Sequence, residues 1–211
     1  MKRKIPNLML VTNKKNAETE KYLDFVISCI EAGVNAVQLR EKQMNHAELL
    51  MFGQALRSLL QATKTPLIIN DNITLAIELN ADGVHLGQQD ESVIEARKQL
   101  GNDKIIGLSV DTMEQLTTAN NLPLDYIGIG AIFPTKNKAN INTVWGSEAL
   151  TQLSKLSLHP ILAIGGINEH NAKQVIQAGA HGIAAIDAFH AAKNIHETTK
   201  KLLKIIKGDA L

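Results

Sequence analysis

The sequence predicts an α/β protein, a single (β/α)8 TIM barrel in which residues 1–211 form one domain. Strand-like and helix-like segments alternate from end to end, and eight strand segments are each followed by a helical one. No linker rich in Pro, Gly or Ser separates them. In such a barrel the carboxyl ends of all strands open on one face, where we expect the catalytic site.

The predicted strands are short apolar runs that become polar abruptly, such as Leu67-Ile68-Ile69-Asn70-Asp71. Strands of a parallel sheet are buried on both faces, so their sequences are nearly continuous in Val, Ile and Leu. In chain order, the strands are expected at residues 8–12, 36–40, 67–71, 83–86, 105–110, 126–133, 161–165 and 182–187.

The predicted helices follow these strands, and an internal repeat supports the pairing. Residues 31–37, 78–84 and 177–183 share one pattern at helix-to-strand junctions, in which Gly or Asn ends the helix and small residues allow close packing. A doubly wound open sheet is the competing architecture, but no G-x-G-x-x-G sequence follows the first strand. The helices are expected at residues 19–32, 46–62, 73–79, 92–99, 112–120, 147–156, 169–178 and 191–207.

Composition narrows the classes of function. A hydrophobic content of 45% is sufficient for a large core, and a net charge of +1 gives no reason to expect nucleic acid or an acidic membrane as a partner. Aromatic residues make up only 3% of the chain, which is few for stacking on single-stranded nucleic acid. No apolar run is long enough to cross a bilayer, so we expect a cytoplasmic protein, with a homo-oligomer left open. The single cysteine, Cys29, is expected to be an inert core thiol.

Two aspartates, Asp71 and Asp90, follow neighbouring predicted strands. Carboxylates at adjacent strand ends can converge on one Mg²⁺ ion, which prefers oxygen ligands and keeps waters that a phosphate can replace. Another strand ends in Arg40-Glu41-Lys42, which supplies cations for an anionic substrate. A metal on one side and cations on the other indicate a diphosphate site. The alternatives are that each Asp caps the next helix and that the charged triplet is a solvated turn.

Two further segments, which follow the predicted sixth and seventh strands, are candidates for phosphate binding. Residues 133–146 are long for a loop of this kind and carry Lys136 and Lys138, so they are interpreted either as a lid over a diphosphate or as a surface loop. Gly165-Gly166 allows backbone amides to approach a phosphate, although a tight turn needs glycine as well. His85 lies inside a strand, and we expect it to be packed or hydrogen-bonded rather than a metal ligand.

Taken together, these motifs resemble those of the thiamine-phosphate synthase family, in family order and over nearly the whole chain. The motifs are Gln38-Leu39-Arg40-Glu41-Lys42, Ile69-Asn70-Asp71, Gly83-Val84-His85-Leu86-Gly87-Gln88 with Asp90, Ile106-Gly107-Leu108-Ser109, Tyr126-Ile127-Gly128-Ile129-Gly130 with Phe133-Pro134-Thr135, and Ile164-Gly165-Gly166-Ile167.

The resemblance implies a Mg²⁺-dependent transferase that joins two small molecules, hydroxymethylpyrimidine diphosphate and thiazole phosphate, to give thiamine phosphate and diphosphate. It implies that Asp71 and Asp90 bind the metal. The residues that it implies for the pyrimidine diphosphate are Gln38, Arg40, Lys42, Asn70, Ser109 and Lys138, of which Arg40, Lys42, Ser109 and Lys138 are the catalytic candidates. The residues that it implies for the thiazole phosphate are Thr135, Asn137, Gly166, Ile186 and Asp187.

Two positions depart from the family's usual residues, and both belong to the thiazole-phosphate side. Asp187 stands where the family usually has Ser, and Asn137 stands where it usually has Thr or Ser. Asp187 either faces the thiazole phosphate and repels it or caps the last helix, and we favour the cap. The alternative functions are an isomerase related to thiazole tautomerase and a non-catalytic barrel that binds thiazole or pyrimidine phosphates.

Overall fold

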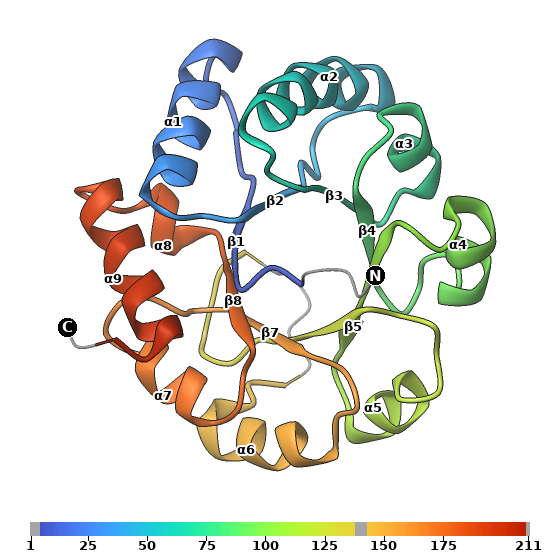
Figure 1. Ribbon diagram of the computed structural model, residues 1–211, viewed down its shortest axis with the longest axis vertical. Coiled ribbons are helices and arrows are strands. Elements are labelled where there is room, and N and C mark those ends of the chain that lie inside the picture. The colour runs from blue at the N-terminus through green and yellow to red at the C-terminus, as the bar shows by residue number, and fades with distance from the viewer. Residues whose placement is uncertain (1–4, 138–142, 210–211) are drawn as a thin grey trace.

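Eight parallel strands form a closed barrel in the computed structural model, which describes residues 5–137 and 143–209 (Figure 1). The strands are β1 (Leu8–Val11), β2 (Ala36–Leu39), β3 (Leu67–Asn70), β4 (Gly83–Leu86), β5 (Ile105–Val110), β6 (Tyr126–Ile129), β7 (Ile161–Ile164) and β8 (Gly182–Ala185). The helices are α1 (Thr19–Ala32), α2 (His46–Thr63), α3 (Ile73–Glu78), α4 (Val93–Leu100), α5 (Met113–Ala119), α6 (Gly146–Leu156), α7 (Ala172–Gln177), α8 (Asp187–His190) and α9 (Ile195–Lys207).

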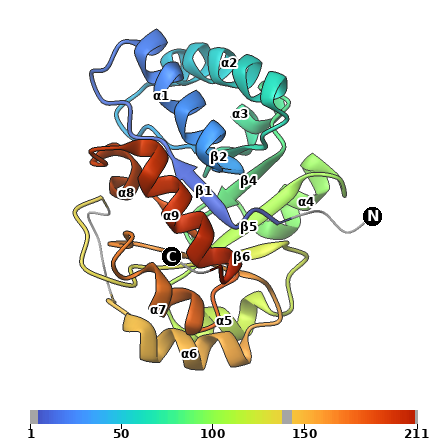
Figure 2. The same cartoon turned by 60° about the vertical axis from the view of Figure 1, so that its left-hand side comes forward.

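The barrel closes through the pairing of its first and last strands. Each strand pairs in parallel with the next along the chain, and β1 pairs with β8 in the register Leu8↔Ile183. The helices surround the strands, and the two views together place α9 beside α1 and α7 (Figure 2). The predicted (β/α)8 barrel is therefore confirmed. The alternative of an open sheet is wrong, because the first and last strands of an open sheet do not pair with each other, whereas β1 and β8 do.

The predicted junction repeat has a physical basis in backbone pairing. The residue just before each even-numbered strand donates its N–H to a carbonyl at the start of the preceding strand. These bonds are Asn35 to Leu8, Asp82 to Leu67, Asp125 to Ile106 and His181 to Ile161. The carboxylates of Asp82 and Asp125 also accept the N–H groups of Leu67 and Ile106. The same backbone bond therefore also forms before β6, where the sequence does not show the repeat.

Several predicted boundaries were wrong, most clearly in the last third of the chain. β6 ends at Ile129 rather than at residue 133, because Ile132 and Phe133 leave the ladder and donate their N–H groups to Ile164 and Gly165. α7 begins at Ala172 rather than at 169. A short helix, α8, replaces the end of the predicted eighth strand. The last helix begins at Ile195, after Asn194 caps it by accepting the N–H of Glu197.

The core has two layers, one outside the barrel wall and one inside it. Alternate strand residues face opposite sides of the wall. Leu8 and Leu10 pack outward against the helices, whereas Met9 and Val11 belong to a separate buried cluster that includes Tyr126. Among the described residues, no helix combines the length and apolar character that a membrane span requires.

Candidate active site

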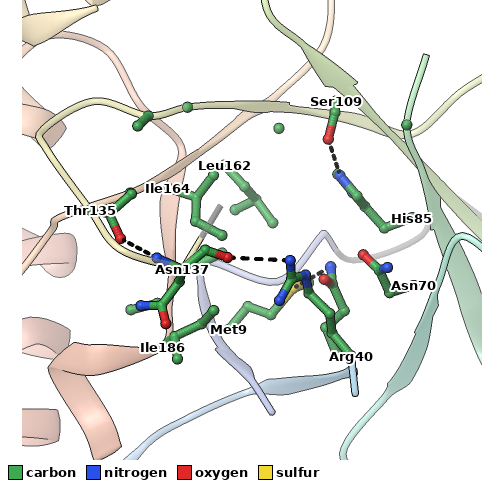
Figure 3. Close-up of a pocket in the computed structure, with 18 of the residues that line it drawn as sticks. Met9, Arg40, Asn70, His85, Ser109, Thr135, Asn137, Leu162, Ile164 and Ile186 are labelled. Atoms are coloured by element: carbon green, nitrogen blue, oxygen red, sulfur yellow. Dashed lines mark hydrogen bonds between the residues drawn. The ribbon is translucent and has the colours of Figure 1, made fainter. Parts of the chain in front are cut away.

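A cavity of about 990 Å³ opens at the carboxyl ends of the strands. Every predicted site residue that the structure describes lines it, namely Gln38, Arg40, Lys42, Asn70, Asp71, Asp90, Ser109, Thr135, Asn137, Gly166, Ile186 and Asp187. In Figure 3, Arg40 and Asn70 lie on one side of the view and Thr135 and Ile186 on the other. Lys138, the remaining predicted residue, lies outside the described residues. The barrel thus gathers residues that are far apart in the sequence, while their roles stay predictions.

Asp71 and Asp90 are not helix caps. α3 is capped by Asn72, whose side chain accepts the N–H of Leu75, and α4 is capped by Ser92. Loss of hydration raises the pKa of Asp90, and the nearby Asp71 carboxylate raises it further, whereas the N–H of Gly87 lowers it. The two carboxylates therefore influence each other electrostatically.

The backbone of Asp71 is held in a left-handed conformation, with φ of 65°. Few residues other than glycine adopt this conformation, although Asp and Asn tolerate it better than most. Its N–H donates to the carbonyl of His85 on β4, which fixes the turn. The side chain of Lys42 lies 2.6 Å from Asp71 Oδ2, so a predicted diphosphate ligand and a predicted metal ligand are paired here. Such backbone strain is common at functional sites.

Arg40 follows β2 and reaches across the cavity towards the segment after β6. Its Nη2 donates to the backbone carbonyl of Asn137 at 3.3 Å (Figure 3). Burial lowers the pKa of the guanidinium, while the charges of Asp71 and Glu41 raise it. A guanidinium remains charged in proteins, so Arg40 presents a partly desolvated cation to the cavity.

The deeper wall of the cavity contains a hydrogen-bonded chain of polar side chains. His85 Nδ1 lies 2.9 Å from the hydroxyl of Tyr126. His85 Nε2 lies 2.9 Å from Ser109 Oγ, as Figure 3 shows. Gln38 is nearly fully buried beside them and donates to Met9 Sδ. The expectation of a hydrogen-bonded His85 is confirmed.

His85 and Tyr126 were not among the predicted site residues, yet both line the cavity. The positions that face the two rings are occupied by glycine. A Cβ atom at Gly128 would lie 2.8 Å from the His85 ring, and one at Gly107 would overlap the Tyr126 ring. Gly107 pairs with Tyr126 on the neighbouring strand, so this glycine can be linked to the ring once the strand pairing is known, whereas Gly128 lies two strands away from His85 and faces it across the barrel interior.

Gly165 and Gly166 are required by the packing of the turn after β7. Both have positive φ, 97° and 65° respectively. A Cβ at Gly166 would collide with Pro134 and Phe133, and one at Gly165 would collide with Ala131. These constraints explain both glycines as turn residues. Because Gly166 also lines the cavity, its predicted contact with a phosphate remains compatible with the turn.

The two departures at Asn137 and Asp187 meet in space. Asn137 Nδ2 donates to Asp187 Oδ2 at 2.7 Å. Asp187 is the first residue of α8 and makes no capping hydrogen bond, and the last helix is capped by Asn194 instead. The helix-cap interpretation of Asp187 was therefore wrong. Its carboxylate lies in the wall of the cavity and is held there by the segment after β6.

A model of the family described as thiamine monophosphate synthase matches residues 8–189. The chain belongs to this family. It is 52% identical over 199 residues to a protein of Chlamydia abortus named thiamine-phosphate synthase, with 94% of each chain covered. It is 42% identical to a protein of the same name from Vibrio campbellii, covering 86% of this chain and 89% of that protein.

A solved structure agrees with this assignment to the thiamine monophosphate synthase family. The thiamine phosphate pyrophosphorylase of Pyrococcus furiosus superposes with a TM-score of 0.84 at 31% sequence identity, and 96% of each chain is covered. The predicted family is thus confirmed, and the chain spans nearly the full length of these relatives.

The carboxylate pair of this family member fits a magnesium ion. In the described part of the chain, no group of three or more His, Cys, Asp or Glu side chains could hold a metal. Mg²⁺ does not need such a cage, because it is often held by one or two carboxylates and completes its coordination with waters and substrate phosphates. Asp71 and Asp90 supply two such carboxylates, and Arg40 and Lys42 line the same cavity.

Proposed function

We propose that this protein catalyses the transfer of a hydroxymethylpyrimidine group from its diphosphate to thiazole phosphate, forming thiamine phosphate and releasing diphosphate. It is an enzyme of the thiamine monophosphate synthase family. The observation that carries the assignment is the 52% identity to a thiamine-phosphate synthase over nearly the whole of both chains. The proposal treats residues 1–211 as one catalytic domain whose active face is the carboxyl end of the barrel.

The pyrimidine diphosphate is proposed to bind on the side of β2, β3 and β4. Arg40 and Lys42 would hold its phosphate oxygens, because both cations line the cavity at the end of β2. Asp71 and Asp90 would hold Mg²⁺, which would neutralise charge on the departing diphosphate. The buried wall formed by Gln38 and the His85 chain would receive the uncharged pyrimidine ring. Asn70 and Ser109 would add polar contacts at the ends of their strands.

Catalysis requires one bond to break and one to form at the same methylene carbon. The carbon–oxygen bond to the diphosphate breaks, and the diphosphate leaves with the electron pair. The thiazole nitrogen then donates its lone pair to the methylene carbon. Arg40 and Lys42 would stabilise the negative charge that develops on the leaving oxygens. Lys138, outside the described residues, is proposed to add a third cation.

The thiazole phosphate is proposed to bind on the side of β6, β7 and β8. Thr135 offers a hydroxyl there, and the turn at Gly166 brings backbone close to the cavity without a side chain. Ile186 is buried in the cavity wall and provides an apolar surface for the thiazole ring. We further propose that the reaction takes place in the cytoplasm.

Mixing the protein with both substrates and Mg²⁺ tests the proposal directly. We expect thiamine phosphate and diphosphate in equal amounts, only when both substrates are present, and inhibition by a chelator that excess Mg²⁺ reverses. Formation of a thiazole isomer without metal would indicate the isomerase instead. Substrate binding without any product would indicate a non-catalytic barrel.

A further inference from the structure

Asn137 contacts residues on both sides of the cavity at once. Its backbone N–H donates to Thr135 Oγ1 at 3.3 Å, and its backbone carbonyl accepts Arg40 Nη2 at 3.3 Å (Figure 3). Its side-chain amide donates to Asp187 Oδ2 at 2.7 Å. A residue of the segment after β6 therefore links the end of β2 with the start of α8.

Asp187 contributes a negative charge to a cavity proposed to bind two anions. A carboxylate that faces a phosphate weakens its binding, so the residue needs a different role to be tolerated there. The 2.7 Å bond to Asn137 is short and charge-assisted, which makes it stronger than the bonds that a neutral acceptor would form. This geometry orients the carboxylate towards Asn137.

We propose that Asp187 and Asn137 form a positioning pair whose function is to orient Arg40. Asp187 fixes the side chain of Asn137, and the fixed Asn137 presents its carbonyl to the guanidinium of Arg40. Through Asn137, Asp187 on the thiazole-phosphate side thus affects the position of Arg40, the cation proposed to bind the pyrimidine diphosphate. The proposal rests on the proposed function for its kinetic consequence, whereas the hydrogen-bonded link itself can be measured without substrate.

The pair makes a prediction that simple charge repulsion does not make. If Asp187 acted by repelling the thiazole phosphate, its removal would lower the KM for that substrate. If Asp187 supports Arg40, its removal raises the KM for the pyrimidine diphosphate. Asp187→Ala removes both the charge and the acceptor, while Asp187→Asn removes the charge but keeps an acceptor oxygen. The two variants therefore separate the contribution of the bond from that of the charge.

We expect Asp187→Ala and Asn137→Ala each to raise the KM for the pyrimidine diphosphate by about fivefold or more, as the loss of one hydrogen bond to a charged group would. Asp187→Asn should raise it clearly less. Asn137→Asp should impair the enzyme by placing two carboxylates together, and the double variant Asn137→Asp with Asp187→Asn should recover activity because it restores an amide-to-carboxylate bond in reverse. The rescue is not expected if either side chain acts alone.

Trypsin cleavage after Lys136 gives a readout that needs no substrate. Lys136 is exposed and directly precedes Asn137, so loss of the pair should speed cleavage of this bond in Asp187→Ala, which leaves the residues on either side of the bond unchanged. Asp187→Asn should be cleaved more slowly than Asp187→Ala. Asn121→Ala and Asp103→Asn make comparable changes at exposed positions away from the cavity and should alter neither cleavage nor KM.

The two proposals fail in different ways. A wild-type protein that makes no thiamine phosphate would overturn the proposed function, while the cleavage rates would still test the pair. Equal effects of Asp187→Ala and Asp187→Asn, a selective fall in the KM for thiazole phosphate, or cleavage that does not differ between wild type and Asp187→Ala would each overturn the positioning pair.

Discussion

Asp71 combines a strained backbone with a carboxylate that is proposed to bind the metal. Its φ of 65° suits Asp, Asn and Gly far better than Ala. Ala at this position would therefore alter the backbone as well as remove the carboxylate. Asn would keep the backbone and change mainly the charge, which makes it the more informative substitution.

We predict that Asp71→Asn lowers product formation by at least about a hundredfold, because an amide is a much poorer Mg²⁺ ligand than a carboxylate. The midpoint of thermal unfolding should change little. Steady-state assays with increasing Mg²⁺ test this prediction, with Asp103→Asn as an exposed control outside the cavity. Turnover and Mg²⁺ dependence equal to those of the wild type would remove Asp71 from the metal site.

Cys29 illustrates a residue whose chemistry is suppressed by its position in the fold. The side chain is fully buried in α1, and burial raises the pKa of the thiol to about 12. The thiolate is the reactive form, so a raised pKa and lack of access both slow its reactions. We predict that the native protein does not react with an aromatic disulfide reagent at pH 8 and that one thiol per chain reacts in denaturant. Rapid labelling of the native protein would contradict the inert core thiol.

At the scale of elements, Asp82 before β4 and Asp125 before β6 each bind the start of the preceding strand and an arginine of a neighbouring helix. We call each of these two arrangements a clamp. Asp125 accepts the N–H of Ile106 and pairs with Arg97 of α4 at 2.8 Å, with 9% and 12% of the two side chains exposed. Asp82 pairs with Arg57 of α2 in the same way, but 37% of the Asp82 side chain is exposed. The two clamps therefore differ in the burial of the carboxylate, and Arg97 also donates to backbone carbonyls of Pro123, Gly101 and Lys104, whereas Arg57 Nε is buried without a partner among the described residues.

We predict that Asp125→Ala lowers the free energy of unfolding by about 3 kcal/mol or more, because it leaves a buried guanidinium without its anion. Asp82→Ala should cost roughly half as much, since water can replace part of the lost interaction. Urea unfolding followed by circular dichroism measures both, with Asp103→Ala as an exposed reference. Equal losses at the two positions would contradict the prediction that the more buried clamp contributes more to stability.

The elements that the sequence predicted well are those with one dominant physical signal. The boundaries of β4 and β5 and those of α1 agree with prediction because apolar runs or helical spacing end there abruptly. β6 was extended to residue 133 because Ala131, Ile132 and Phe133 remain apolar. These residues are buried or half-buried beside β7 without joining the ladder, and apolar character alone does not distinguish the two arrangements.

At the scale of the whole molecule, the predicted barrel was enough to place twelve predicted residues on one cavity. Topology predicts that strand ends converge, so Asp71 and Asp90 could be assigned to one site from the sequence. The bond between Asn137 and Asp187 could not be predicted in this way. It joins residues 50 positions apart through the conformation of an irregular segment, which no periodicity encodes. The roles of these residues remain predictions for experiment.

Binding of diphosphate should stabilise the whole barrel, because the proposed ligands come from several strands. A ligand that binds only the folded state at about 100 times its dissociation constant adds roughly 2.7 kcal/mol. For a chain of this size that corresponds to an increase of about 5–10 °C in the unfolding midpoint. We predict such an increase with inorganic diphosphate and Mg²⁺ together and a much smaller one with either alone, since the carboxylate pair and the diphosphate oxygens would repel each other without the metal.

The same measurement separates metal-assisted anion binding from nonspecific attraction to the cations. In Asp71→Asn the joint effect of Mg²⁺ and diphosphate should be largely lost, although Arg40 and Lys42 are still present. The control Asp103→Asn should keep the full increase. An equal increase with diphosphate alone, or an increase that survives in Asp71→Asn, would mean that the cations bind the diphosphate without the carboxylates, and the metal would then have to be placed elsewhere on the barrel face.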